Sequence, residues 1–472
     1  MKQSMPTKFF VAGSIILFLG LMMGPVTANV SNNSSTQTPM STTKDVYTLI
    51  IITPSVFADE LQSLVVHKKA MGLTTKLVTL DDVRQQEYWH GRDCAEKIKY
   101  FIKSAIEQWG TRYVLLVGGR SSQFLPTWYC PVRYVHMSDD WDSEYLSDLY
   151  FADIYDTHGN FSSWDSDNDG RYGEWYPGEV AQDSGIDLIP DVAVGRLPCR
   201  NKQEAAIMVN NIISYETSTY GNPWFSKILV VAGDTYPEKD NPNWTGYEGE
   251  YYGNRTIENM SGFTPTRLYT SDGTFAKAED VIRAFKTGWG FTYLVGHGSP
   301  KQWGNHPPNS DDFIQGPNSN SMWRLRNKDK LPVCVVSGCH NSQFDVCLRR
   351  VFNATTRWNQ EGISECWSER IIHQANGGAI ACLGCTGLGY TKEDKTTFKG
   401  GINELEGAFF HAYGQHDVTV LGDTWKAAIT WYAQTYPVDW NSQAWSDSWI
   451  DTKVMQSWAL FGDPSLHIGG YP

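Results

Sequence analysis

The sequence has little positive charge. Its 39 lysines and arginines are outnumbered by 52 aspartates and glutamates, so the formal net charge is −13. A protein that binds nucleic acid needs a basic face to meet the phosphates. This balance therefore argues against nucleic acid as a partner, although it says little about the fold.

Long apolar runs are also missing, apart from one near the start of the chain. That run, Phe9 to Met23, follows Lys2 and Lys8 and precedes the small residues Val26-Thr27-Ala28. This order is typical of a secretory signal peptide, which we expect at residues 1–28. The alternative is an uncleaved membrane anchor, although a spanning helix needs about 20 apolar residues and this run is shorter. A membrane is a partner only if the segment is kept.

No short repeat is found, and one segment has no apolar period. Residues 29–44 are rich in Ser, Thr and Asn, which predicts a disordered spacer. A signal peptide would place the protein outside the cell or at its surface. Glycosylation sequons fit that location. They lie at Asn160, Asn243, Asn254, Asn259 and Asn353.

The rest of the chain contains two successive series of strand-like and helix-like segments. Continuous apolar runs such as YVLLVGG (113–119) and SKILVVAGD (226–234) alternate with amphipathic segments such as residues 94–110. Strands that are apolar throughout indicate a parallel sheet covered on both faces. We therefore predict an α/β fold of two consecutive doubly wound, mostly parallel sheet subdomains, residues 45–220 and 221–472.

The nine cysteines are an odd number, so in a secreted chain at least one thiol is left over unless it pairs with another chain. The connectivity cannot be read from the sequence. Cys382 and Cys385 could belong to a zinc site with Cys334 and His340, which would require four convergent ligands. A disulfide or two buried thiols is the simpler alternative. A spare thiol is also what a cysteine nucleophile requires.

Two strands of the second series end in reactive residues. The segment GFTYLVGHGSP places His297 between two glycines, and LPVCVVSGC ends in Cys339. In open parallel sheets, sites form beyond the carboxyl ends of the strands. If the two strands are neighbours, the imidazole and the thiol meet at one edge, and the imidazole can favour the thiolate or protonate a leaving amine.

The glycine after the histidine fits the same chemistry. Gly298 lets the backbone approach a substrate closely, and its N–H can point at a developing oxyanion. The N–H of Cys339 is the candidate for a second donor. The alternative is that His297 and Cys339 are ordinary residues at the edge of the sheet, with no catalytic part.

The pair YLVGHGSP and VCVVSGCH resembles the catalytic His-Gly and Cys motifs of the caspase-like cysteine peptidases, most closely the gingipain type. Other segments are similar to landmarks of that family in the same order, namely LIIITPSVFADELQSLVVHKKAMG, SDLYFADIYD, IPDVAVGRLP and WALFGDPSL. The resemblance implies a secreted cysteine endopeptidase acting on proteins or peptides. Cys339 is its implied nucleophile, His297 its acid and base, and residues 221–472 its catalytic subdomain.

The resemblance implies two further site residues. Gingipains orient the histidine with an acidic residue that falls by this match on Asp191, where the family has Glu. An aromatic wall of the substrate pocket falls on Tyr390. Oxyanion stabilisation falls on the backbone of Gly298 and Cys339. No acidic residue of this chain matches the one that receives a basic side chain in the Arg- and Lys-specific enzymes.

An acidic loop at WDSDNDGRYGEW is a candidate metal site. Asp165, Asp167 and Asp169 alternate before a glycine, and Glu174 follows. Calcium takes six to eight oxygen ligands from a flexible loop, so we expect a structural calcium there and no cofactor for catalysis. The spacing is not that of an EF-hand, and an acidic solvated loop is the alternative.

Three functions therefore remain open. A secreted gingipain-like endopeptidase would form a thioester acyl-enzyme and hydrolyse it. A silent cell-surface binding module could keep the same fold, because fold does not imply function. A transpeptidase would resolve the acyl-enzyme with an amine instead of water.

Overall fold

The structure is a computed structural model that describes residues 45–237, 246–392 and 399–472. The expected signal peptide, the expected spacer and Asn243 lie outside the described residues. Within the described ranges, no helix has both the length and the apolar character needed to cross a membrane.

Ten strands form one central sheet in the order β2-β1-β3-β6-β15-β14-β13-β9-β7-β8. Every neighbouring pair in it is parallel except β14 and β15. The predicted α/β class with a mostly parallel sheet is confirmed. The two series of strands meet in this one sheet, where β15 lies between β6 of the first series and β14 of the second. The strands are β1 (Leu49–Thr53), β2 (Thr75–Thr79), β3 (Tyr113–Val117), β6 (Ala193–Leu197), β7 (Lys227–Ala232), β8 (Thr264–Tyr269), β9 (Phe291–Val295), β13 (Val333–Ser337), β14 (Ala381–Cys385) and β15 (Trp458–Phe461).

Short strands, eleven α-helices and four short 3-10 helices complete the described part. The short strands are β4 (Tyr134–Val135), β5 (Tyr145–Leu146), β10 (His297–Gly298), β11 (Trp303–Asn305) and β12 (Ile314–Gln315). The helices are α1 (Gln62–Ala70), α2 (Leu80–Gln86), α3 (Cys94–Trp109), α4 (Lys202–Ser218), α5 (Glu248–Asn259), α6 (Ala278–Phe285), α7 (Ala354–Trp358), α8 (Trp367–Ile372), α9 (Ile402–His416), α10 (Leu421–Thr435) and α11 (Asp447–Gln456).

Local sequence explains the elements of the sheet and its helices. Strands β1, β3 and β13 are buried at every position, as expected for strands covered on both faces. Helix α3 begins where the Asp93 side chain accepts from the backbone N–H of Glu96. It ends at Gly110, whose φ of 70° suits glycine. These signals are local, so the sequence could predict them.

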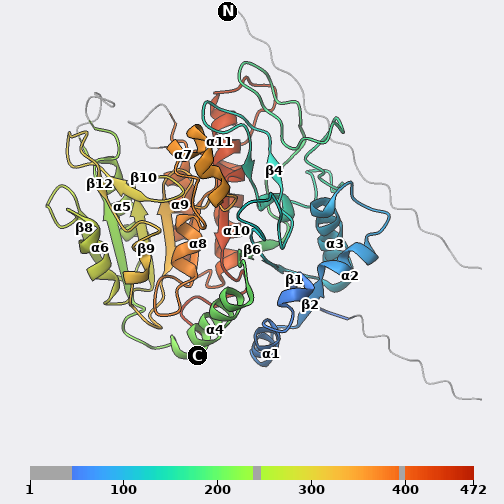
Figure 1. Ribbon diagram of the computed structural model, residues 1–472, viewed down its shortest axis with the longest axis horizontal. Helices are drawn as coiled ribbons and strands as arrows, with labels where there is room; N and C mark the ends of the chain where they lie inside the picture. Colours follow the sequence, from blue (N-terminus) through green and yellow to red (C-terminus); the bar gives the residue numbers. More distant parts are fainter. Residues whose placement is uncertain (1–44, 238–245, 393–398) are drawn as a thin grey trace, which may run out of the picture. The chain divides into compact units, whose positions relative to one another are not determined.

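Helices cover both faces of the sheet near its centre. In β13, the Ser337 hydroxyl accepts from Asn403 in α9. A Cβ on Gly384 of β14 would lie 2.9 Å from Val336 of β13 and 3.2 Å from Ser368 of α8, so Val336 and α8 share one face of the sheet. Because successive residues point to opposite faces, α8 and α9 lie on opposite faces. In Figure 1 the orange and red C-terminal elements lie between the blue and the yellow-green ones, in agreement with the strand order.

Candidate active site

The ends of two neighbouring strands form the site. Strands β9 and β13 are parallel partners, and Val295 pairs with Ser337 at their carboxyl ends. The Ser337 carbonyl accepts from the Gly296 N–H at 3.2 Å and from the Trp303 indole N–H at 3.2 Å. His297 and Cys339 lie one and two residues beyond these linked positions. The structure therefore brings the two predicted residues to the same edge of the sheet.

A backbone carbonyl holds the imidazole of His297. Its Nε2 lies 2.7 Å from the carbonyl oxygen of Thr235, which follows β7. A carbonyl can only accept, so Nε2 carries the proton and Nδ1 is the basic nitrogen of the ring. The ring also meets Tyr236 and His306 edge to face, with centroids 5.9 and 5.4 Å away. The histidine is thus fixed in one tautomer and orientation.

Two buried side chains hold the loop that carries this carbonyl. Asn305 donates to the Thr235 hydroxyl at 3.2 Å and to the Val295 carbonyl at 2.8 Å. Glu248, at the start of α5, accepts from the Tyr236 N–H at 3.2 Å. The loop after β7 is therefore tied to the end of β9, which carries the histidine.

The thiol of Cys339 is half-buried. It donates to the carbonyl oxygen of Gly389 across 3.8 Å. Burial raises the pKa of Cys339. The bond that the thiol donates to the Gly389 carbonyl also favours the protonated form. A thiol in this state needs a base to become a nucleophile, and the imidazole at the same edge is of the right chemical type.

Gly298 lies against the backbone of the cysteine loop. A Cβ at this position would fall 2.7 Å from the Cys339 carbonyl oxygen and 2.2 Å from Asn341 Oδ1. A Cβ on Gly338 would fall 2.9 Å from the Gly298 nitrogen. Neither position accepts a side chain, so both glycines are needed for this close approach.

A cleft of about 700 Å³ opens beside the thiol. Cys339 and Gly298 contribute to its lining, together with Trp141, His340, Leu388 and the segment 357–361. This volume suits a few residues of a bound chain.

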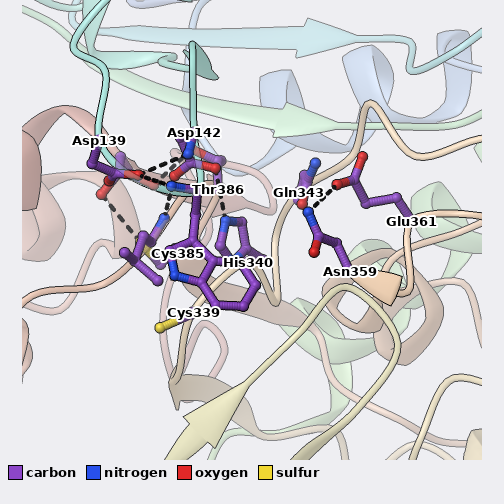
Figure 2. A network of polar contacts seen from close by, with 12 residues as sticks. Asp139, Asp142, Cys339, His340, Gln343, Asn359, Glu361, Cys385 and Thr386 are labelled. Atoms are coloured by element: carbon purple, nitrogen blue, oxygen red, sulfur yellow. Dashed lines mark hydrogen bonds and ion pairs between the residues drawn. The ribbon is translucent and has the colours of Figure 1, made fainter. Parts of the chain in front are cut away.

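Two carboxylates, Asp139 and Asp142, lie near Cys339, and Figure 2 shows Asp142 joined to His340. Asp142 accepts from His340 Nε2 at 2.9 Å and from the Leu388 N–H at 2.7 Å, so it connects residues adjacent to Cys339 and to Gly389. Lys453, fully buried, contacts Asp139 and lies 3.2 Å from Asp142. Burial would raise the pKa of Asp142, but His340 and Lys453 hold it well below its usual range.

Tyr390 lies close to the site but not in the wall of the cleft. Its hydroxyl donates to Asp139 at 2.9 Å, and its ring packs on Trp449 with centroids 5.3 Å apart. The described residues that line the cleft include Leu388 but not Tyr390. The structure thus places this tyrosine behind the cleft, as a support for Asp139.

The structure does not bring Asp191 to the histidine. Its carboxylate accepts from the N–H groups of Ile154 and Tyr155 at 2.7 and 2.9 Å. Asp191 precedes β6, at the amino end of the strand, and β6 lies four strands from β9. Neighbouring strands are about 4.8 Å apart, so the carboxyl cannot reach the imidazole.

The acidic loop gathers one carboxylate more than the sequence pattern suggested. Ligand atoms of Asp165, Asp167 and Asp183 lie within 4.8 Å of one another, and so do those of Asp167, Asp169 and Glu174. The Glu174 side chain is buried, and its Oε2 has no hydrogen-bond partner among the described residues. Asp183 is missed by sequence reasoning because it lies outside the alternating motif.

The zinc alternative does not fit the geometry. Cys382 and Cys385 are three residues apart on β14, so their side chains point to opposite faces. Among the described residues, no group of three or more potential ligands includes a cysteine. All nine cysteines are described, and all are free thiols.

A further group of potential ligands, Glu204, Glu365 and His373, is joined by arginines. Arg200 contacts both carboxylates, at 2.6 and 2.9 Å, and Arg370 contacts Glu365 at 2.7 Å. The cations already supply the charge that a metal would bring, so this group is an ion-pair network.

Comparison with known proteins agrees with the resemblance seen in the sequence. The model of a protein family, peptidase family C25, matches residues 42–469. Gingipain R2 of Porphyromonas gingivalis is 20% identical over 426 residues, which cover 89% of this chain and 45% of that protein. An uncharacterised protein of Archaeoglobus fulgidus is 26% identical over 258 residues, 52% of this chain and 59% of its own length. The chain thus spans about half the length of these curated relatives.

Solved structures share the fold. A crystal structure of the Arg-specific cysteine proteinase gingipain R superposes with a TM-score of 0.60 at 18% identity, and the match covers 91% of this chain and 80% of that one. The complex of the pro- and mature domains of RgpB superposes with a TM-score of 0.57 at 17% identity, over 89% and 79% of the two chains. At this identity the likeness shows the fold alone.

Proposed function

The chain belongs to peptidase family C25, and on that premise we propose that it is a cysteine endopeptidase with Cys339 as nucleophile and His297 as acid and base. Its substrates are then proteins or peptides. The observation that supports the proposal is the pairing of β9 with β13, whose carboxyl ends lead to His297 and Cys339, and Cys339 lines a cleft.

The proposed reaction has two stages. Nδ1 of His297 takes the thiol proton as sulfur attacks the scissile carbonyl carbon, and the backbone N–H groups of Gly298 and Cys339 stabilise the oxyanion. The carbon–nitrogen bond then breaks, the imidazolium gives its proton to the leaving amine, and a thioester remains. Water attacks the thioester with His297 as base, which releases the acid and restores the thiol.

The orienting group in this proposal is a carbonyl. The Thr235 oxygen accepts from Nε2–H, so Nδ1 is left as the basic nitrogen. The hydrogen bond from Nε2–H to this oxygen becomes stronger when the ring is charged. No role in the reaction is needed for Asp191, whose carboxylate binds the backbone of Ile154 and Tyr155.

Cleavage of an unbiased fluorogenic peptide library tests the proposal. We expect the full chain, with calcium present, to release fluorophore, and we expect Cys339→Ala to lose about 10³-fold or more in kcat/KM. Cys94→Ala is the matched control, because Cys94 is exposed on α3, far along the chain from the cleft loops. It should cleave like the natural chain.

The other outcomes of this experiment are distinct. Unchanged cleavage by Cys339→Ala would contradict the proposed mechanism. Silence from the full chain together with retained binding of peptides would support a silent binding module. Product masses that correspond to a new amide bond, formed with an added amine, would identify a transpeptidase.

We also propose a structural calcium in the acidic loop. The carboxylates of Asp165, Asp167, Asp169, Glu174 and Asp183 lie close enough together to supply the oxygen ligands that calcium prefers. The buried, unpartnered Oε2 of Glu174 supports this assignment. Equilibrium dialysis should give bound calcium for the natural chain and less for Asp183→Asn; no bound calcium would contradict the proposal.

Secretion completes the proposed function. It depends on residues 1–28 as a signal peptide, so the chain should appear outside the cell with a new N-terminus after Ala28. N-terminal sequencing of the exported protein measures this. Retention in the membrane with Met1 intact would favour the anchor instead.

A further inference from the structure

The two charged residues that line the cleft beside Cys339 differ in whether they already have an ionic partner. Its lining includes one arginine, Arg357, and one carboxylate, Glu361. Glu361 is already bound, because Arg350 Nη1 lies 2.6 Å from it and the Asn359 side chain donates to it at 3.2 Å. Asp142, which is not among the lining residues, accepts from His340 and lies 3.2 Å from Lys453.

Arg357 differs from all of these groups. It is exposed, and among the described residues it has no carboxylate partner. It lies on α7, where the Asn353 side chain accepts from the N–H groups of Thr355 and Thr356 and fixes the start of the helix. The guanidinium is therefore presented to the cleft from a defined backbone, with its donors available to a ligand.

Two tryptophans line the same cleft as Arg357. Trp141 is 56% exposed and Trp358 is 79% exposed, although both line the cleft. Tryptophan is enriched at binding interfaces, because the indole ring buries a large area for little loss of conformational freedom. Exposed indole rings at a cleft therefore favour a peptide-binding surface. They can cover the methylene part of a bound side chain while its end meets Arg357.

We propose that the cleft selects a substrate with an acidic residue, Asp or Glu, next to the scissile bond, whose carboxylate pairs with Arg357. The inference rests on the proposed function, since it concerns the substrate of the same site. It is the opposite of the preference stated for the Arg-specific gingipain R that shares the fold. A basic side chain would meet an unpaired cation and no unpaired carboxylate in the described cleft.

The test uses matched fluorogenic peptides that differ at one position, with Asp, Asn or Lys at each site flanking the scissile bond. We expect one position at which Asp exceeds its isostere Asn by about 5- to 10-fold in kcat/KM, and Lys ranks last. The advantage of Asp should shrink at high salt, because exposed charge pairs are screened.

Variants of the exposed arginine isolate the effect. Arg357→Gln should remove the preference for Asp, so that the Asp and Asn peptides are cleaved with equal kcat/KM, and Arg357→Glu should favour Lys over Asp. Arg349→Gln is the control, since Arg349 is also exposed but does not line the cleft. Equal cleavage of Asp and Asn peptides at every position, or a preference for Asp that Arg357→Gln keeps, would overturn the inference.

Binding separates this inference from the proposed function. The Cys339→Ala variant cannot turn over, so its affinity for the same peptides reports recognition alone. Tighter binding of the Asp peptide that is lost in Cys339→Ala/Arg357→Gln supports the inference even if the full chain cleaves nothing, in which case only the proposed function fails. Equal binding of Asp and Asn peptides overturns it.

Discussion

Two groups of acidic residues in this protein are built differently. Asp139 and Asp142, behind the thiol, enclose a lysine of the chain itself, because Lys453 is fully buried between them. In the loop from Asp165 to Asp183, the described cations that contact the carboxylates are Arg92, which meets Asp165, and Arg171, 3.4 Å from Glu174, and both are partly exposed. The first group is complete within the chain, whereas the second leaves Glu174 Oε2 buried without a partner.

The difference in pKa follows from this arrangement. His340 and Lys453 hold the pKa of Asp142 well below its usual range, against the opposing effect of burial. Burial raises the pKa of Asp183 to about 6, because only backbone and hydroxyl donors oppose it. A covalently attached cation gives a permanently charged, rigid brace next to the nucleophile. The open group depends on a cation from solution, so its order should depend on the medium.

The largest expected effect comes from removing the cation of the closed group. Lys453→Met leaves two buried carboxylates without their shared partner, and we expect the free energy of unfolding to fall by about 3–5 kcal/mol. Urea unfolding measures the loss. Lys103→Met is the control, because it breaks an exposed pair with Glu107 and should cost less than about 1 kcal/mol. If the two variants were equally stable, Lys453 would not stabilise Asp139 and Asp142 more than an exposed ion pair does.

Supplying a cation to the open group should have the next largest effect. At a free calcium concentration 100 times the dissociation constant, we expect about 2.7 kcal/mol of added stability, seen as a higher melting temperature than with a chelator. The gain should be smaller in Asp183→Asn. A melting temperature that is the same with calcium and with the chelator would mean that the open group holds no ion.

A buried carboxyl outside these two groups gives a third way to neutralise the charge, because it binds a proton. Its expected effect on stability is smaller. Glu406 in α9 has its pKa raised by burial to about 8, from 4.5. Between these values the folded chain keeps a proton that the unfolded chain loses, so this group's stabilisation is complete below about 4.5 and is lost as the pH rises toward 8. Glu406→Gln should flatten this slope by about 1 kcal/mol per pH unit. Urea unfolding at pH 5.5 and 7.5 measures it, and equal slopes would contradict the assignment.

The sheet was readable from the sequence where the signal is local. Runs such as Tyr113–Val117 are apolar throughout, and glycines such as Gly110 end helices, so most strands and helices are expected near their observed positions. Strand β15 is different. It is only four residues long, and nothing local shows that it lies between β6 and β14. The two predicted series therefore do not by themselves reveal one continuous sheet.

The candidate site divides in the same way. His297 and Cys339 follow apolar strands, and the rule that sites form beyond carboxyl ends predicts that they meet. Asp191 precedes its strand, and the same rule places it at the other edge, which the family resemblance alone did not consider. The Thr235 carbonyl has no side-chain signature, and Lys453 reaches Asp139 from a distant part of the chain. Neither could be found from spacing.

The position of β15 has a consequence for how the protein folds. Phe461 pairs with Arg196 in the centre of the sheet, so this contact joins residues that are very far apart in the chain. Closing so long a loop carries a large entropic cost before any pairing is gained, and we expect it to be among the slowest steps of folding. Strand β15 is also synthesised after every other strand. Until then, the strands on its two sides present open edges, and the nucleophile loop is complete before the sheet that carries it.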